Sequence, residues 1–440
     1  MQNSDSQAAA ALNRATAPAF RAIERIDVPV AERTQLDNGV PVYLVNAGTQ
    51  EVVRIEVVFE AGNWYQNAPM IAAVANALIS GGTASMTAEQ IAERFDFYGA
   101  YISLNTNMDH ASVTLYTLNK YLEPTLALFQ QVIREASYPE REVETHVRNT
   151  RQEFLVNQEK VGVLSRRHFR SVLHGANHRY GSLATVADFD NINQQQLLNF
   201  KAAHYHGNCA TIVVAGKVPA ELMGLLNQHF GSDWEGPASP EYDTALNPQP
   251  TGRTFIEKED AIQSAIRIGR YMVPRSHEDF MPMQLLNAVL GGYFGSRLMS
   301  NIREDKGYTY GIGSAVVAWH RNSQFFIATE VGAEVTEAAI EEIYKELALL
   351  RDQPIPEDEL QLVKNYLLGN LLKSIDGPFS LADRLKPLFL SGLDESYYHR
   401  FVESIHGTGA EKLQALAQQY FKNDAMLELV AGNKNAISAL

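Results

Sequence analysis

The chain has 440 residues, 45% of them hydrophobic and 20% charged, and it exceeds the roughly 250–300 residues that one hydrophobic core supports. Its 37 Lys and Arg against 51 Asp and Glu give a net charge of −14, which repels phosphate backbones and excludes nucleic acid as the main partner. No apolar stretch approaches the roughly 18 residues of a membrane span. We therefore expect a soluble protein of at least two domains.

The first residues of the chain, 1–25, are mostly polar or alanine. The start has neither the basic region nor the apolar region of a signal peptide, so we expect a flexible N-terminal segment. The same composition is also compatible with the trimmed terminus of an exported protein. The compartment therefore stays open between periplasm and cytoplasm, and this terminus favours the periplasm.

An internal duplication organises the rest of the chain. Pro139-Glu-Arg-Glu142 is answered in the second half by Pro356-Glu-Asp-Glu359, and each copy precedes an amphipathic stretch with helical spacing. The apolar strand that ends at Ala215-Gly216 is answered by one that ends at Ala431-Gly432. Because both repeats have nearly the same offset, we expect two domains built on one plan.

Each copy alternates apolar strands with helices and includes strands that follow one another without an intervening helix. This order predicts the α+β class: two homologous domains, each a mainly antiparallel sheet with helices packed on one face, that enclose a cleft. Residues 231–253 contain four prolines and few apolar residues, which indicates a linker. The predicted domains span residues 26–230 and 254–440.

Three groups in the first copy have side chains that can bind metal or react, but each has a simpler structural interpretation. His174 and His178 are four residues apart, yet the glycine between them indicates a helix end rather than a metal-bearing face. His204 and His206 have no third ligand in view. Cys209 is the only cysteine and begins an apolar run, so we expect an inert thiol in a buried strand.

Two helices are expected early in the second copy. Met283–Leu290 has helical spacing, and Gly291-Gly292 should end that helix. Ser296 can cap a second helix, which reaches Arg303.

A strand follows that second helix. Gly307 can supply the left-handed turn that ends the helix, and Tyr308–Trp319 is rich in valine and aromatic residues, as strands are. Such a reversal brings Arg303 near Tyr310. Together these side chains could hold peptide carbonyl oxygens and stabilise the oxyanion of a tetrahedral intermediate. From spacing alone, a surface ion pair and a half-buried strand tyrosine are the simpler interpretation.

The run from Gly291 to Tyr310 resembles the second-domain signature of pitrilysin-type zinc metallopeptidases, the inverzincin family that contains mitochondrial processing peptidase. In that family an Arg and a Tyr have this seven-residue spacing and follow a glycine loop. The resemblance covers nearly the whole chain, including the duplicated plan. It implies that Arg303 and Tyr310 are functional and that Gly291 and Gly292 contact substrate.

The same resemblance implies that the first domain has lost its metal. The family binds zinc there through H-x-x-E-H on a helix, in which two histidines ligate the metal and the glutamate activates water. Counted back from Gly82-Thr83, these positions hold Ala73, Asn76 and Ala77, none of which can do that work. The third ligand position falls near Asn149, and Glu144 and Glu153 are the alternatives within a few residues of it. We therefore expect this chain to bind no metal by itself.

The two copies thus retain different parts of the family's site. In the first copy, Phe95 and Ile102 stand where Arg303 and Tyr310 stand in the second. Members of the family commonly work as pairs of chains around a chamber, and several pairs contain one chain without zinc. The resemblance implies a bacterial heterodimeric zinc metalloendopeptidase, in which a homologous subunit carries H-x-x-E-H and zinc.

In this interpretation the present chain supplies Arg303 and Tyr310 to a peptide that adds as a strand to a sheet edge. The alternative is a catalytically silent subunit that only scaffolds or binds peptides. A third hypothesis, a peptidase that works alone with an unrecognised metal site, has no sequence feature in its favour.

Overall fold

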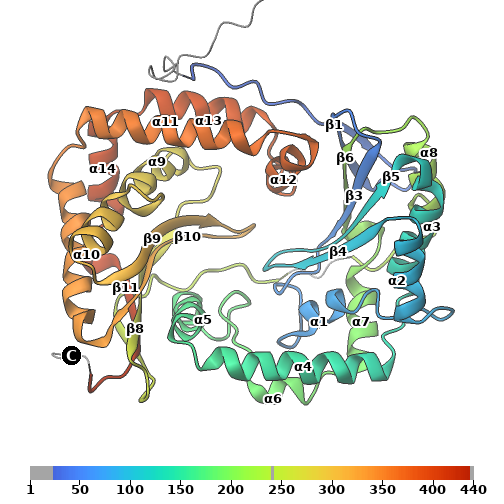
Figure 1. The fold of residues 1–440 in the computed structure, drawn as a ribbon, viewed down its shortest axis with the longest axis horizontal. Helices are drawn as coiled ribbons and strands as arrows, with labels where there is room; N and C mark the ends of the chain where they lie inside the picture. Colours follow the sequence, from blue (N-terminus) through green and yellow to red (C-terminus); the bar gives the residue numbers. More distant parts are fainter. Residues whose placement is uncertain (1–22, 239–241, 437–440) are drawn as a thin grey trace, which may run out of the picture.

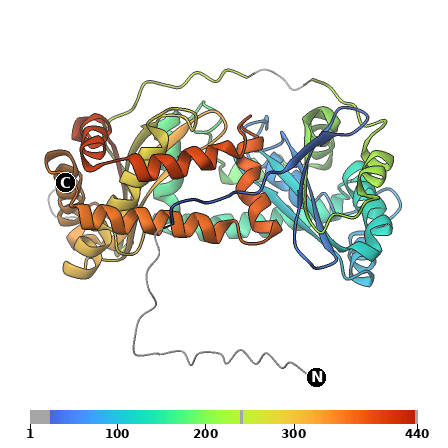
Figure 2. The ribbon, with the colours of Figure 1, turned by 90° about the horizontal axis from the view of Figure 1, so that it is seen from above.

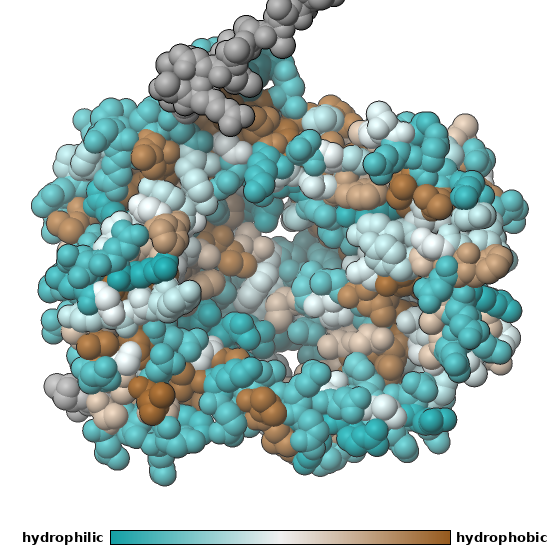
Figure 3. Space-filling model, viewed as in Figure 1, coloured by the Kyte–Doolittle hydropathy of each residue, from teal (hydrophilic) through white to brown (hydrophobic). Residues whose placement is uncertain are grey.

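The computed structural model describes residues 23–238 and 242–436, so the predicted flexible segment 1–25 lies outside the described residues except for its last three. Two β-sheets with their helices lie side by side (Figure 1). The space-filling view is hollowed between the two halves (Figure 3). The predicted α+β class is confirmed.

Six strands form the first sheet. They are β1 Glu32–Gln35, β2 Pro41–Asn46, β3 Val52–Phe59, β4 Tyr101–Thr106, β5 Ala111–Leu118 and β6 Ala210–Gly216. Their order is β1-β2-β6-β3-β5-β4, and only β2 and β6 pair in parallel. β3 is central because its valine and isoleucine side chains are buried on both faces of the sheet.

Five strands form the second sheet. They are β7 Gly252–Glu257, β8 Gln263–Met272, β9 Thr309–Ala318, β10 Ser323–Gly332 and β11 Leu427–Gly432. Their order is β7-β11-β8-β10-β9, and only β7 and β11 pair in parallel. This order and pairing repeat those of β2-β6-β3-β5-β4, so the predicted duplication is confirmed strand by strand.

Helices of the first half mostly cover the outer face of the first sheet. They are α1 Ile71–Ala77, α2 Ala88–Phe97, α3 Leu122–Glu135, α4 Glu140–Gln158, α5 Val161–His174, α6 Val186–Phe189, α7 Gln194–His204 and α8 Leu222–Phe230. Thr87 caps α2 and Asn193 caps α7, each in a capping box. α4 is the helix predicted to follow Pro139.

Helices of the second half repeat this arrangement. They are α9 Phe280–Gly291, α10 Thr336–Asp352, α11 Glu357–Ser374, α12 Pro378–Phe389, α13 Ser396–Gly407 and α14 Ala410–Tyr420. Pro378 occupies the first position of α12, where a missing N–H costs nothing. None of the described helices is long and apolar enough to cross a membrane.

One helix from each half packs on the sheet of the other half, which the sequence did not predict. Phe169 and Leu173 of α5 pack with Leu427 and Leu429 of β11 in the second sheet. α12 packs against β6 and β2 of the first sheet, where Phe389 stacks on Tyr43 with ring centroids 4.1 Å apart. Figure 1 shows both helices bridging the halves, α12 above the hollow and α5 below it.

Buried charges fix the contact of α12 with β3. Arg54 and Glu56 of β3 are each 3% exposed. The Arg54 guanidinium lies 2.8 Å from an Asp383 carboxylate oxygen, and the Lys386 ammonium donates to Glu56 at 2.8 Å. Arg54 and Glu56 also approach each other to 4.0 Å, so the two α12 side chains complete a network of four charges that begins within the first sheet.

The equivalent hairpins β4–β5 and β9–β10 meet at their tips in the middle of the molecule. The backbone N–H of His320 donates to Asp109 at 2.9 Å, and Arg321 donates to the Tyr65 hydroxyl at 3.1 Å. Tyr180 also donates to Asp109. A carboxylate from one hairpin therefore anchors the other.

The predicted linker contains no helix or strand among its described residues before β7 begins at Gly252. Residues 231–238 and 242–251 run along the outside of the molecule between the two halves (Figure 2). Two side chains of this connection anchor it to the first core: Trp234 is buried there, and Tyr242 packs against it.

We predict that Arg54→Met lowers the free energy of unfolding by about 3 kcal/mol, because it leaves a buried carboxylate network short of one cation. Urea denaturation checks this value. The matched control is Asp383→Asn, whose side chain is 56% exposed, and this change should cost at most about 1 kcal/mol. Equal stability of Arg54→Met and the wild type would show that the network does not hold the halves together.

Candidate functional site

The segment that positions Arg303 is a short π-helix, Met299–Asp305, after the glycine loop that ends α9. The Lys306 N–H donates to the Asn301 carbonyl at 2.9 Å, a five-residue spacing. Gly307 follows with φ +67°, which is the predicted left-handed turn, and β9 begins at Thr309. π-helical turns occur often at functional sites because they displace a side chain from the regular helical register.

Arg303 and Tyr310 lie together, as the predicted reversal requires. The Arg303 guanidinium carbon lies 5.4 Å from the centroid of the Tyr310 ring and 4.7 Å from that of the Phe294 ring. Tyr310 is 93% exposed and Phe294 62% exposed. Two aromatic faces therefore hold the guanidinium by cation–π contacts at the surface. Within the described part of the chain, Arg303 has no ion-pair partner.

Ser296 precedes the second helix, which begins at Arg297 as predicted, but its side chain does not cap that helix. Its hydroxyl is buried and makes no hydrogen bond to any described residue, and only its backbone carbonyl bonds into the helix, accepting from Ser300 at 2.9 Å. The turn that follows widens into the π-helix Met299–Asp305.

Thr309 fixes the backbone that presents Tyr310. Its hydroxyl lies 2.7 Å from the Glu330 carbonyl and 2.9 Å from the Thr329 hydroxyl. The register between β9 and β10 shifts at this point, which marks a bulge. Bulges re-aim side chains near sites, and this one leaves Tyr310 on the free edge of the sheet.

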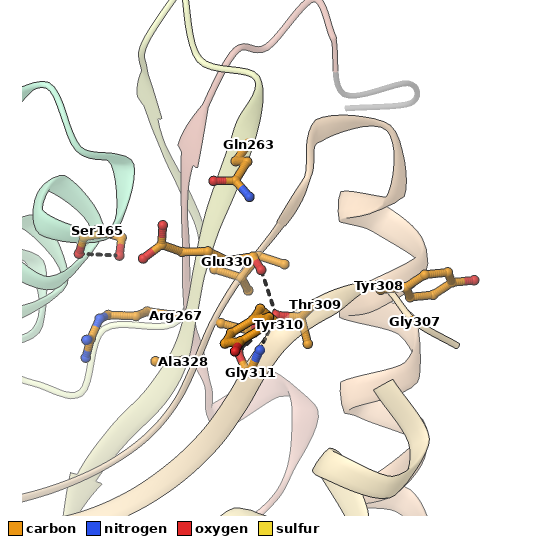
Figure 4. Close-up of a pocket in the computed structure, with 13 residues that line it drawn as sticks. Ser165, Gln263, Arg267, Gly307, Tyr308, Thr309, Tyr310, Gly311, Ala328 and Glu330 are labelled. Carbon is orange, nitrogen blue, oxygen red and sulfur yellow. Dashed lines mark hydrogen bonds between the residues drawn. The ribbon is translucent and has the colours of Figure 1, made fainter. Parts of the chain in front are cut away.

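A cavity of about 780 Å³ adjoins Tyr310 between β9, β10, β8 and α5. Glu330 and Arg267 extend from the sheet toward Ser165 of α5 in Figure 4, whereas Tyr308 points away from the cavity. Burial, together with the nearby charge of Arg166, lowers the pKa of Arg267 to about 10. The cavity thus has one cation and one carboxylate beside an exposed tyrosine.

This arrangement can bind a peptide and stabilise negative charge. The Tyr310 hydroxyl and the Arg303 guanidinium are both hydrogen-bond donors at an open strand edge. An extended peptide can pair with the main chain of that edge and place a carbonyl oxygen near these donors.

Gly291 lets α9 pack closely on β9, and Gly292 fits closely against α9 itself. A Cβ on Gly291 would lie 2.7 Å from the Ser314 hydroxyl, and one on Gly292 would lie 2.8 Å from the Ala288 Cα. Both distances are below any real Cβ contact, so glycine is needed for this packing. Their contact with substrate stays a prediction.

The helix that would carry a zinc motif does not fit a metal. Asn76 is 1% exposed, and its amide donates to the Asn105 carbonyl at 2.9 Å and to the Ser112 carbonyl at 3.3 Å. Its side-chain oxygen accepts from the Tyr205 hydroxyl at 3.1 Å. Ala73 and Ala77 add only methyl groups on the more open side of α1. The Asn76 amide therefore bridges its neighbours structurally. Together with Ala73 and Ala77 it does not provide the ligands that zinc needs.

The remaining predicted positions lie apart from Arg303, Tyr310 and Phe294, which together form the Arg303 group. Asn149 is exposed on α4. Phe95, the first-copy counterpart of Arg303, is 4% exposed in the core, and Ile102 packs against that core from β4. In the first half, the equivalent turn from helix to strand therefore contributes side chains to the hydrophobic core.

Both histidine pairs have structural contacts. The rings of His174 and His178 stack with centroids 5.3 Å apart, and burial, followed by the charges of His178 and Arg170, lowers the pKa of His174 to about 3. His204 packs on Phe200 at 4.7 Å, and the His206 ring lies 3.0 Å from the Ala203 carbonyl. Cys209 is buried as predicted, one residue before β6 begins.

Sequence reasoning missed Phe294, Thr309, Arg267 and Glu330. Phe294 lies in the glycine loop, and the presence of an aromatic residue in that loop is the one signal in the sequence that could have identified it. Arg267 and Glu330 come from two strands and line one cavity only because those strands are neighbours. That pairing cannot be read from either strand alone.

Comparisons with known families give two matches. Residues 41–183 match the model described as insulinase (peptidase family M16), and residues 191–367 match the model described as peptidase M16 inactive domain. Together these ranges cover most of the chain and include α1 and the Arg303 group.

Other proteins resemble this chain in sequence or in fold. An uncharacterized zinc protease, YmxG, from Bacillus subtilis is 24% identical over 92% of this chain and 99% of its own length. A peptidase M16 inactive domain from Pseudomonas fluorescens has a similar fold with a TM-score of 0.83, at 24% identity over 91% of this chain and 98% of that one. A protease from Helicobacter pylori has a TM-score of 0.84, at 19% identity over 92% and 100%.

We predict that Asn76→Ala lowers the free energy of unfolding by about 2–3 kcal/mol, because it leaves two carbonyls and the Tyr205 hydroxyl without their partner. Thermal or urea denaturation measures this loss. Asn287→Ala is the matched control in α9, since Asn287 donates to one carbonyl, that of Ser314 at 3.3 Å, and should cost about 1 kcal/mol. A smaller loss for Asn76→Ala than for Asn287→Ala would contradict the bridging role.

Proposed function

Because the chain belongs to the M16 family of zinc peptidases, we propose that it is the non-metal subunit of a heterodimeric zinc metalloendopeptidase. The two matching family models confirm the family that the sequence predicted. In this proposal the chain supplies Arg303 and Tyr310 for peptide binding and oxyanion stabilisation. A homologous subunit carries H-x-x-E-H and its zinc.

One observation carries the proposal: the Arg303 guanidinium is held between the Phe294 and Tyr310 rings at an open strand edge. Surface side chains that serve only solubility need no such arrangement. Holding the guanidinium in advance reduces the entropy that binding a carbonyl would otherwise cost. The 93% exposure of Tyr310 leaves its hydroxyl able to reach a second chain.

The contrast between the two halves supports a division of labour. α1 presents alanine at two motif positions and a fully bonded asparagine at the third. In a subunit of this kind the chain's own residues bind the peptide, orient it and donate hydrogen bonds to its carbonyl oxygen. The Tyr310 hydroxyl donates its hydrogen bond more strongly as negative charge develops on that oxygen.

A catalytically silent scaffold or peptide-binding subunit is the second candidate. The family model matched in the second half is described as an inactive domain, which favours it. The two candidates differ in one respect: a scaffold tolerates substitution of Arg303 and Tyr310 as long as assembly is preserved.

We predict that Tyr310→Phe lowers kcat about 10²-fold in a mixture of this chain with a zinc-motif homologue from the same organism. The loss follows from removing one oxyanion donor while leaving the ring that packs on Arg303. EDTA-sensitive hydrolysis of a quenched peptide gives the rate. The chain alone should be inactive, and the mixture should exceed the homologue by itself.

The matched control is Tyr101→Phe, which removes the hydroxyl of an exposed tyrosine from β4, the edge strand of the first sheet. Its turnover should equal that of the wild type. Normal turnover by Tyr310→Phe would refute catalysis by this chain and support the scaffold. EDTA-sensitive activity of the purified chain alone would refute both candidates.

A further inference from the structure

A second cavity, of about 590 Å³, lies among α9, α11, α12, α13 and the end of β9. Three cationic side chains line it, Arg275, Lys373 and Arg384, together with Tyr397 and Tyr398. No carboxylate is among the residues that line it. In a chain of net charge −14, such a concentration of uncompensated positive charge is unusual.

The arginines in this cavity lie against the two tyrosine rings. The Arg275 guanidinium carbon is 6.0 Å from the Tyr397 centroid, and that of Arg384 is 5.1 Å from the Tyr398 centroid. The Nε of Arg384 is buried without a hydrogen-bond partner among the described residues. Burial is the main reason that the pKa of Tyr397 rises to about 12, so its hydroxyl stays protonated and can donate.

Like charges gathered in a partly desolvated cavity repel one another unless an anion joins them. Guanidinium groups match the two oxygens of a carboxylate, and a tyrosine hydroxyl can donate a further bond. The cavity is thus complementary to an oxyanion.

The position of the cavity favours an oxyanion carried by a peptide. Val316 and Ala318 of β9 line it, and Tyr310 stands at the other end of the same strand. β9 is the last strand of its sheet, so its outer edge can pair with an added strand. Tyr310 and Val316 are 316 − 310 = 6 residues apart, a distance of about 20 Å along a strand.

We propose that this cavity binds a carboxylate of a peptide that pairs with the edge of β9, about six residues from the part held at Tyr310. The inference rests on the proposed peptide-binding function and adds its substrate class, peptides with an acidic group at this distance. The carboxylate is either the C-terminus of the peptide or an aspartate or glutamate side chain. Both sources offer the same two oxygens.

Direct binding to the full chain without its partner tests the proposal. Fluorescence anisotropy compares labelled, uncharged peptides of about twelve residues, long enough to pair along β9. One peptide ends in a free carboxylate, one ends in an amide, and one is amidated with a single internal glutamate. We expect at least one of the two acidic peptides to bind about tenfold or more tightly than the neutral amide, and which of them does identifies the source.

The variants Arg275→Gln, Arg384→Gln and Lys373→Gln should each reduce that preference. Lys373 is exposed, so its variant folds even if the loss of a half-buried arginine is not tolerated. The matched control is Arg400→Gln, which removes the same charge from the exposed side of α13, where Arg400 donates to Ser396 at 2.7 Å. Its preference should equal that of the wild type. Inorganic phosphate, a competing oxyanion, should weaken binding of the acidic peptide only.

Equal binding of acidic and neutral peptides, or equal losses in Arg400→Gln and the cavity variants, would overturn the proposal. Absence of binding by every peptide would overturn it as well. The hydrolysis assay with Tyr310→Phe separates this failure from failure of the proposed function. Slow turnover of that variant with no carboxylate preference means that the subunit acts on peptides but this cavity does not select them.

Discussion

The reciprocal packing of α5 and α12 is the constraint on which the rest of the structure depends. Each helix covers a face of the other half's sheet, so neither half can bury its apolar surface alone. A linker without helix or strand would not fix two domains relative to one another. Arg54 and Glu56 are buried and have their ion-pair partners on α12, so α12 must dock with those partners facing β3. The hollow between the halves is therefore part of the fold.

Duplication explains how one frame serves two different purposes. Asn76 of α1 and Asn287 of α9 each donate to a carbonyl on the neighbouring edge strand, Asn105 of β4 and Ser314 of β9. The frame of helix and edge strand is the same in both halves. The two halves differ in the side chains that do not hold this frame together. In the first half these are the alanines on the open side of α1, and in the second half they are Arg303 and its two aromatic neighbours beside β9.

The local parts of the fold could be predicted from the sequence, whereas the long-range parts could not. Helices after Pro139 and Pro356 follow from their spacing, and the turn at Gly307 follows from its glycine. The exchange of α5 and α12 could not be predicted, because a strand buried on both faces does not reveal which helix covers each face. The π-helix before Gly307 escaped prediction for a related reason: tertiary contacts, rather than propensity, set the width of that turn.

The exposure of the Arg303 group is itself an argument about its purpose. Removing Tyr310 or Phe294, at 93% and 62% exposed, should cost the fold little, since neither fills a core. The buried side chains that do maintain the fold, Asn76 and Arg54 among them, lie elsewhere. A group that contributes little to stability, lies at an unpaired strand edge and holds a guanidinium between two rings suits the proposed contact with a second chain. Edge pairing supplies affinity without regard to sequence, and the cavities at the two ends of β9 are where side chains of that second chain would be selected.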